Sequence, residues 1–162
     1  MKKYFLITFL LSVSTITYCQ TLRLDSNGFF IDSRQITCVQ DVVNSLGLPE
    51  RTSTKINKIW TYDSLGLRVY LDPASSQLKQ VSLDFRKYDF NFSPKKLFSG
   101  KLLILKHNID ENTPLTDLKE IKELNFKENA VIRSYSGTIS TLKLYFEYTG
   151  DVNKLEAVHI SF

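Results

Sequence analysis

The chain of 162 residues has few of the residues that make loops, covalent links or metal sites. It contains 6 Gly, 4 Pro, 2 Cys and 2 His, whereas 43% of its residues are hydrophobic. This composition excludes a collagen-like, disordered or low-complexity chain. Two cysteines cannot form a disulfide framework or a cysteine-rich zinc site, so a hydrophobic core must hold the fold together. The length suits one domain or two very small ones.

The sequence also lacks the short motifs that most often mark catalysis. It has no Gly-x-Gly-x-x-Gly or Gly-Lys-Ser/Thr phosphate loop and no Gly-x-Ser-x-Gly nucleophile turn. Neither His107 nor His159 has a second histidine or a cysteine at the spacing of a metal site, and each is interpreted as an exposed or edge residue. We therefore predict no catalytic residue, no bound metal and no cofactor.

Residues 1–19 have the organisation of a secretory signal peptide. The start at Met1–Lys3 is basic, the run from Tyr4 to Val13 is apolar, and small polar residues follow up to Cys19. The apolar run is roughly half the length that spans a bilayer, so a retained membrane anchor is disfavoured. We expect a periplasmic or secreted protein with no transmembrane segment in the mature chain.

Two processing routes remain open for this leader. Cleavage after Cys19 places Thr17 and Cys19 at the −3 and −1 positions and leaves Gln20 as the first residue. Alternatively, Cys19 is kept and lipidated, as in outer-membrane lipoproteins, although the bulky Tyr18 departs from the small residue that such signals place before the cysteine. The first route leaves Cys38 without a cysteine partner in its own chain and so excludes an internal disulfide.

The positive charge of the chain is partly a property of the leader. The formal charge is +4, and removal of the leader deletes Lys2 and Lys3 but no acidic residue, which lowers it to +2. A segment at 86–98 interleaves aromatic and basic residues, as binders of single-stranded nucleic acid do. In an exported protein, however, aromatic residues at every second position are better explained by contact with a sheet face. We predict no nucleic-acid partner.

Apolar spacing predicts a helix and a sheet in the first half of the mature chain. Val39, Val42, Val43 and Leu46 share one helical face, and Thr37 with Gln40 fits a capping box, so a helix is expected over 38–46. Gly47 and Pro49 then end the helix. Three alternating runs over 58–62, 67–72 and 77–85 predict an antiparallel meander with one covered face.

The second half repeats this order, with a helix that begins at Pro114 and three further strands. The runs 67–72 and 77–85 align with 142–147 and 154–162, and five of the fifteen aligned positions are identical. The sequence therefore predicts an α+β fold made of two tandem helix-plus-antiparallel-sheet units. The expected organisation is a signal peptide at 1–19, a first repeat at 20–87, an aromatic and basic connector at 88–98, and a second repeat at 99–162.

One solvent-facing pattern recurs in both predicted hairpins, as a basic residue, a tyrosine and an acidic residue at alternate positions. Tyrosine is enriched at protein interfaces, so this pattern predicts a binding surface on the sheet. The alternative explanation is that tyrosine suits an exposed strand and that the charges keep the sheet soluble. The candidate residues are Trp60, Tyr62, Arg68, Tyr70, Asp72, Lys143, Tyr145 and Glu147.

Two resemblances rest on particular motifs. The order of Leu46–Pro49, Trp60–Tyr62 and the following hairpin resembles the small-protein-A/BamE type of envelope lipoprotein domain, whose tandem copies form the fold of the β-lactamase inhibitor protein. The motifs Leu-Gly-x-Pro, Trp-x-Tyr-Asp-x-Leu-Gly and Phe-x-Pro-Lys-x-x-Phe-x-Gly are similar to those of an uncharacterised bacterial secreted domain family. The first resemblance implies only a fold, and the second implies no activity.

These observations lead to one expected function and one alternative of another class. The expected function is an exported, non-enzymatic protein-binding module, either of the inhibitor or immunity type or an accessory of envelope assembly. The alternative is a small envelope hydrolase, or an enzyme that acts on peptidoglycan or lipid, with Cys38 or His107 in its active site.

Overall fold

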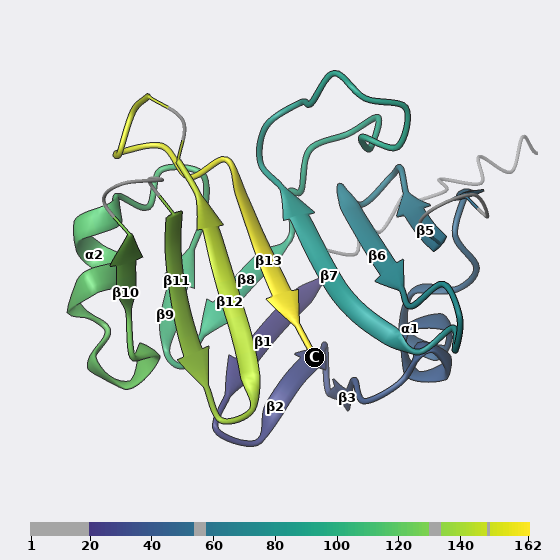
Figure 1. Ribbon diagram of the computed structural model, residues 1–162, viewed down its shortest axis with the longest axis horizontal. Coiled ribbons are helices and arrows are strands. Elements are labelled where there is room, and N and C mark those ends of the chain that lie inside the picture. The colour runs from purple at the N-terminus through teal and green to yellow at the C-terminus, as the bar shows by residue number, and fades with distance from the viewer. Residues whose placement is uncertain (1–19, 54–57, 130–133, 149) are drawn as a thin grey trace, which may run out of the picture.

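The computed structural model describes residues 20–53, 58–129, 134–148 and 150–162. These residues form thirteen strands in two sheets, together with two short α-helices and one 3₁₀ helix (Figure 1). The expected signal peptide, including Cys19, lies outside the described residues.

The larger sheet has eight strands, each antiparallel to its neighbours. From edge to edge they are β10 (Lys127–Asn129), β11 (Ser134–Ile139), β12 (Leu142–Glu147), β13 (Ala157–Ser161), β7 (Leu78–Asp84), β6 (Leu67–Leu71), β5 (Lys58–Tyr62) and β4 (Arg51–Ser53). Two three-stranded meanders, β5–β7 and β11–β13, therefore meet where β7 pairs with β13. The duplication that the sequence suggests stays a prediction.

The smaller sheet has five strands and joins distant parts of the chain. Its order is β3 (Arg34–Gln35), β2 (Gly28–Ile31), β1 (Thr21–Asp25), β8 (Lys101–Ile104) and β9 (His107–Ile109). The pairing of β1 with β8 is parallel, with Leu22 opposite Leu102. Parallel neighbouring strands need a long connection, and here the chain that connects β1 to β8 contains all of β2–β7.

The two sheets pack face to face, with the larger sheet in front in Figure 1. Alternate residues of the longer strands point into one shared core, including Val81 and Ile160 of the larger sheet and Leu22 of the smaller one. The rings of Phe29 and Phe162 meet edge to face across the two sheets, with centroids 6.0 Å apart. The inner face of the larger sheet is therefore apolar, and the residues between these core positions lie on its outer face.

The helices lie at opposite ends of the sandwich (Figure 1). Helix α1 (Val39–Leu46) contributes Val42 to the core, and helix α2 (Leu115–Glu120) contributes Leu118. The 3₁₀ helix η1 (Lys122–Leu124) follows α2. Each helix places apolar side chains in the shared core, and neither forms a separate layer over a sheet.

The predicted span of α1 is confirmed to within one residue, but its cap differs from the predicted one. Cys38, rather than Thr37, is the N-cap residue, and Asp41 replaces Gln40 as the partner. The Asp41 carboxylate accepts hydrogen bonds from the backbone N–H groups of Thr37 and Cys38, at 2.9 and 3.1 Å. A carboxylate is favoured here because it also faces the positive end of the helix dipole. Gly47 ends the helix with a φ of 78°, as predicted.

The expected α+β fold of two tandem helix-plus-sheet units is wrong, because the protein is mainly β. Short strands that the sequence pattern did not indicate, among them β1, β4 and β9, account for much of the difference. Their two to five residues are too few for a clear alternation of apolar and polar positions. The helices are also short, with eight and six residues. The proposed division of the chain at 88–98 is a separate expectation and stays a prediction.

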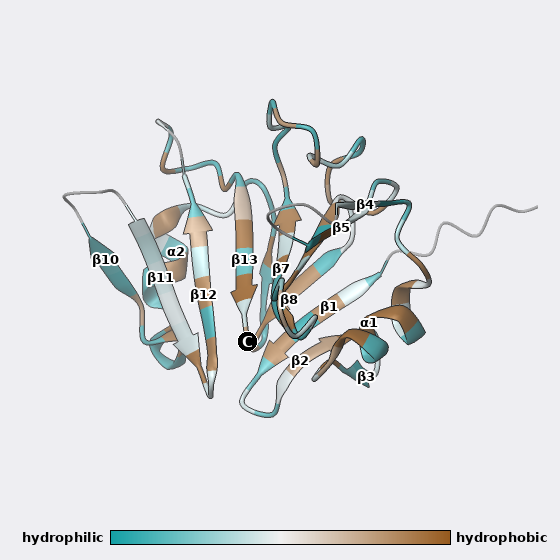
Figure 2. Cartoon of the chain, turned by 45° about the vertical axis from the view of Figure 1, so that its right-hand side comes forward, coloured by the Kyte–Doolittle hydropathy of each residue, from teal (hydrophilic) through white to brown (hydrophobic). Residues whose placement is uncertain are grey.

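Two features of the surface follow from this architecture. Within the described residues, neither α-helix has the length and apolar character needed to cross a membrane. The edge strand β10 has only polar, exposed residues and is teal throughout in Figure 2. Charged residues on an edge strand discourage pairing with another chain.

Replacing Gly66 with alanine should strongly destabilise the fold. Gly66 has a φ of +71°, and an added Cβ atom would lie 2.1 Å from the backbone nitrogen of Phe98. We expect a loss of about 3 kcal/mol or more in the free energy of unfolding, measured by urea denaturation. Gly47→Ala is the matched control, since its φ is +78° and no atom lies within 4 Å. It should lose only about 1 kcal/mol, and equal losses for both variants would show that crowding at Gly66 is unimportant.

Candidate functional site

The outer face of the larger sheet carries polar side chains in rows that cross its strands. Because successive residues of a strand alternate between faces, the core positions of β6, β7, β12 and β13 leave the intervening residues on the outside. Strand register then aligns Arg68 with Ser82, Ser82 with His159, and His159 with Tyr145. The neighbouring row contains Tyr70 and Gln80. We call this surface, between β6 and β12, the polar face.

A hydrogen-bond network connects His159 to both central strands and to the connector. The ring atom Nε2 of His159 lies 2.7 Å from Oε1 of Glu147, and Nδ1 lies 2.8 Å from the hydroxyl of Ser82. The amide Nε2 of Gln80 donates to the Ser82 hydroxyl at 2.9 Å. The hydroxyl of Tyr88 donates to Oε2 of Glu147 at 2.5 Å. Both carboxylate oxygens of Glu147 are therefore occupied.

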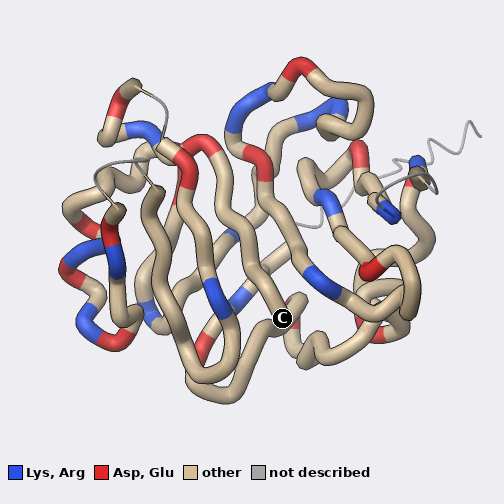
Figure 3. The backbone as a smooth tube through the Cα atoms, in the orientation of Figure 1, with Lys and Arg blue, Asp and Glu red and all other residues tan. Residues whose placement is uncertain are grey.

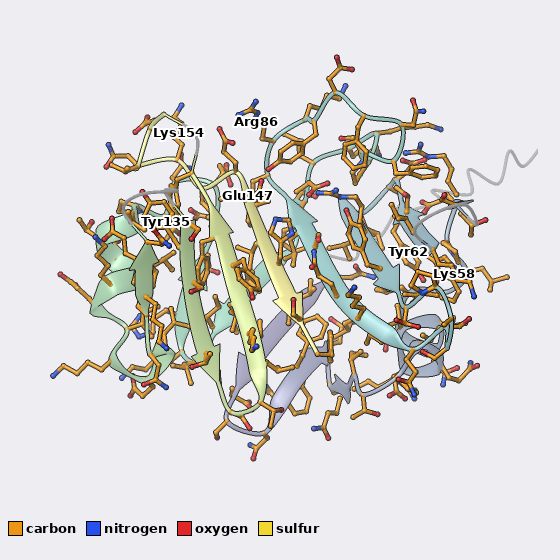
Figure 4. The ribbon with its side chains drawn as sticks, viewed as in Figure 1. Lys58, Tyr62, Arg86, Tyr135, Glu147 and Lys154 are labelled. Atoms are coloured by element: carbon orange, nitrogen blue, oxygen red, sulfur yellow. The ribbon has the colours of Figure 1, made fainter. Side chains whose placement is uncertain are left out.

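Glu147 is the residue of this network whose ionisation is most strongly altered. The hydrogen bond from His159 lowers the pKa of the Glu147 carboxyl to about 2, partial burial opposes that change, and Tyr88 reinforces it. Burial, together with the bond to the Glu147 carboxylate, raises the pKa of the Tyr88 hydroxyl. Glu147 is thus ionised and Tyr88 neutral over the whole physiological range. Figure 4 labels Glu147 at the end of β12 nearest the connector.

A buried ion pair lies beside this network. The guanidinium of Arg68 donates through Nη2 to Oδ1 of Asp84, and through Nη1 to the hydroxyl of Tyr70 at 2.6 Å. The rings of Tyr88 and Phe90 also lie against the guanidinium, with centroids 5.5 and 4.9 Å from its central carbon. Burial raises the pKa of the Asp84 carboxyl, and Arg68 opposes that rise. Atoms Nε of Arg68 and Oδ2 of Asp84 are buried without a hydrogen-bond partner.

The connector between β7 and β8 folds over one end of the polar face. Arg51 holds it there, donating to the backbone carbonyl oxygens of Asn91 and Ser93 at 2.5 and 2.8 Å. The same guanidinium forms a bidentate pair with Asp63, at 2.6 and 2.7 Å. This clamp fixes Tyr88 against Glu147 and Phe90 against Arg68. Tyr88 and Phe90 therefore cover part of the sheet face, as predicted, and the same expectation for Phe92 stays a prediction.

A hollow of about 540 Å³ opens on the polar face. Tyr70, Gln80, Tyr145, Glu147 and His159 are among the residues that line it. Tyr145 is 42% exposed, the largest exposure of an aromatic residue in this group. The volume lies within the range of small-ligand sites. The hollow is therefore large enough for a ligand and is bounded by both halves of the chain.

The structure brings together five of the eight predicted surface residues and separates the other three. The five on the polar face are Arg68, Tyr70, Lys143, Tyr145 and Glu147. Tyr62 is buried on the inner face, and its hydroxyl donates to the Gly47 carbonyl at 3.0 Å. Trp60 packs partly buried against the same core.

Lys143 and Asp72 differ in their relation to the sheet. Lys143 is exposed on the outer side of β12, in the row that contains Tyr70 and Gln80, and does not line the hollow. Asp72 lies in the turn after β6, where its carboxylate accepts from the backbone N–H groups of Ala74 and Ser75 at 3.0 and 2.8 Å. Asp72 therefore stabilises a turn.

Sequence reasoning missed five residues of this site, namely Gln80, Ser82, Asp84, Tyr88 and His159. The available signal was the run of polar residues that alternates with Val81 and Leu83 in β7, which was interpreted only as a strand pattern. His159 was predicted to be an isolated edge residue, but β13 lies in the middle of the sheet. The carboxylate that His159 contacts is that of Glu147. Glu156, which is closer to His159 in the sequence, pairs with Arg86 at 2.6 Å.

Ser82, His159 and Glu147 have the residue types of a catalytic triad. Unlike the serine of a triad, however, Ser82 is not accessible to a substrate. Ser82 is 0% exposed, and its hydroxyl already accepts from Gln80 and contacts His159. A nucleophile must reach the substrate, so Ser82 is better suited to hold the histidine ring than to attack a ligand. Among the described residues, no three His, Cys, Asp or Glu side chains are placed to hold a metal ion.

Cys38 and His107, the residues of the alternative enzyme hypothesis, lie apart from each other and from the polar face. His107 is in β9, at one edge of the smaller sheet, and Cys38 begins the helix that follows β3, at the other edge. Four strand spacings of about 4.8 Å separate these edges, or roughly 19 Å. The two residues therefore form no common site.

Comparison with known proteins gives one match. Residues 21–119 match the family described as a domain of unknown function, DUF7738. The chain belongs to this family. The match includes the smaller sheet and β4–β7, but Tyr145, Glu147 and His159 of the polar face lie beyond it. Membership of an uncharacterised family is confirmed, whereas the quoted motifs and the bacterial, secreted character of the family stay predictions. No curated protein and no solved structure matches the chain.

Removing one member of the Arg68–Asp84 pair should cost more stability than removing both. A lone buried charge lacks compensation, so Arg68→Met and Asp84→Leu should each lose about 3–5 kcal/mol in the free energy of unfolding. The double variant should lose less than either single variant, because an apolar pair leaves no buried charge. Denaturant titration of the four proteins measures this cycle. A double variant with the summed loss of the two single variants would contradict the argument.

Glu147 should stabilise the protein above its usual pKa and stop doing so in acid. Its folded pKa of about 2 lies below the ordinary value of 4.5, so its contribution is complete above pH 4.5 and disappears as the pH falls towards 2. Glu147→Gln should lower the melting temperature at pH 6 by an amount that shrinks between pH 4.5 and 2.5. Glu120→Gln, an exposed change on α2, is the control and should show a small difference throughout. A constant difference for Glu147→Gln would contradict the assignment.

Proposed function

We propose that the protein is an exported, non-enzymatic binding module that docks a protein partner on the polar face. The observation that carries this proposal is the combination of an exposed tyrosine, Tyr145, with a floor of mutually hydrogen-bonded side chains. Tyrosine offers a large contact area at a low cost in conformational entropy. A floor whose polar groups are already bonded needs little rearrangement when a partner arrives.

The dimensions of the larger sheet support a protein partner. Eight strands at a spacing of about 4.8 Å give a width of roughly 34 Å, and five residues per strand give a length of roughly 17 Å. The resulting footprint of roughly 570 Å² approaches the area of about 800 Å² that each protein of a stable complex buries. The adjoining connector, with exposed Phe90 and Leu97, can supply further contact.

The chemistry of the site favours binding over catalysis. Glu147 is held ionised by two hydrogen bonds, Arg68 is paired with Asp84, and Ser82 is covered. A group that acts as an acid, base or nucleophile must be free to exchange a proton or to reach a substrate. The enzyme alternative based on Cys38 or His107 has less support, because those residues form no common site. An inhibitor or immunity-type protein and an envelope accessory both suit a binding module.

The proposal predicts that Tyr145 is required for capture of a partner. In quantitative crosslinking pull-downs from the envelope of the source organism, Tyr145→Ala should reduce the recovery of a specific protein about tenfold or more, with no change in melting temperature. Leu48→Ala is the matched control, because Leu48 is a large apolar residue that is 79% exposed outside the polar face. Equal recovery by wild type, Tyr145→Ala and Leu48→Ala would contradict the docking surface.

A further inference from the structure

We propose that the hollow on the polar face is a binding site for a neutral saccharide. This inference goes beyond the proposed function, since it concerns a small ligand within the hollow, whereas a protein partner would cover the wider sheet face. It rests on three properties of the lining: the engagement of its charged groups in internal hydrogen bonds, the availability of particular hydroxyl and amide groups, and the mixture of aromatic rings with polar groups.

The charged groups of Glu147 and Arg68 are already held in hydrogen bonds within the protein. Glu147 is bonded to His159 and Tyr88, and the guanidinium of Arg68, which bonds the hydroxyl of Tyr70, is paired with Asp84. In Figure 3 the front of the sheet between β12 and β6 carries few charged positions, and most charges lie around its margin. A charged ligand would have to give up its hydration while the charged groups of Glu147 and Arg68 are already engaged within the protein. The lining therefore favours a ligand with no net charge.

Several polar groups of the lining remain available to a ligand. The hydroxyl of Tyr70 accepts from Arg68, which leaves its own proton free to be donated. Gln80 uses its amide nitrogen towards Ser82 and His159, so its carbonyl oxygen can accept. Within the part of the chain that the structure describes, Tyr145 has no hydrogen-bond or ring partner. The hollow thus offers both donors and acceptors at fixed positions, which matches a ligand that carries hydroxyl groups.

The lining of the hollow mixes aromatic rings with polar groups. Tyr70 and Tyr145 project from β6 and β12, and the polar side chains of Gln80 and His159 on β7 and β13 lie between them. The rest of the lining consists of Ser134, Tyr135, Phe146, Glu147 and Tyr148. A sugar ring has an apolar face of C–H groups that stacks on an aromatic ring and a rim of hydroxyl groups that bonds to polar side chains. The volume of about 540 Å³ suits a ligand of one or two such rings.

An uncharged peptide fits the same site less well. A peptide that binds as an extended strand pairs with an open sheet edge, but β6 and β12 each have a neighbour on both sides. A peptide that inserts an apolar side chain would leave Gln80 and His159 without water or a substitute for it. A saccharide places both kinds of surface against the lining at once.

Titration calorimetry with defined probes tests this assignment. The probes are N,N′,N″-triacetylchitotriose, cellotriose and maltotriose, with an N-acetylated and amidated Ala-Tyr-Ala peptide as the competing class. We expect at least one saccharide to bind with a dissociation constant of about 1 mM or tighter. Tyr145→Ala should weaken it about tenfold through the loss of stacking, Tyr145→Phe much less, and Leu48→Ala not at all. Since Tyr145 is exposed, its replacement should leave the protein folded, and circular dichroism checks this.

Each other outcome overturns the inference. Binding of the peptide alone would assign the hollow to a peptide, and binding of none of the probes would remove the ligand site. Saccharide binding that Tyr145→Ala leaves unchanged would place the ligand elsewhere. The result is independent of partner capture: loss of saccharide binding with capture intact removes only this inference, and the reverse result removes only the protein partner.

Discussion

The pairing of β7 with β13 is the constraint on which the rest of the structure depends. It joins the two meanders into one eight-stranded sheet and places Val81 opposite Ile160 on the inner face. The same pairing places Ser82 opposite His159 on the outer face. Because the side chains of a strand alternate, a shift of this register by one residue would bury the polar row and expose the apolar one. The core and the polar face are therefore two results of a single register.

The face that this register creates is less symmetric than the sequence suggests. The aligned repeats make Tyr70 and Tyr145 equivalent, so both would face equivalent positions of the following strand. Instead, Tyr70 faces Gln80, whereas Tyr145 faces His159, two residues further along the alignment. The connection between β12 and β13 is longer than the one between β6 and β7, which allows the offset. As a result Tyr145 lies level with Arg68, and the hollow has different groups on its two sides.

The connector links the polar face to the stability of the molecule. It is clamped by Arg51 and Asp63, and it presents Tyr88 to Glu147 and Phe90 to Arg68. Charges that would be costly to bury alone are thereby brought together under aromatic rings. Part of the bonding that engages the charged groups of the face is thus provided by a segment without a strand, which has no counterpart in the pattern of either meander.

The sequence by itself determined those helices and strands that depend on residues close together in the chain. Helix α1 and strands β5, β6, β7 and β12 could be predicted because apolar spacing, caps and glycine turns act over a few residues. Membership of an uncharacterised family was also predicted from the sequence, although the motifs quoted for it stay a prediction. Only the tertiary structure decided the mainly β class, because it depends on short strands that exist through pairing, such as β1 beside β8. The same holds for the meeting of His159 with Ser82 and Glu147, whose sequence separations are 77 and 12 residues. Strand register is set by the packing of the whole core, and no short window of sequence contains that information.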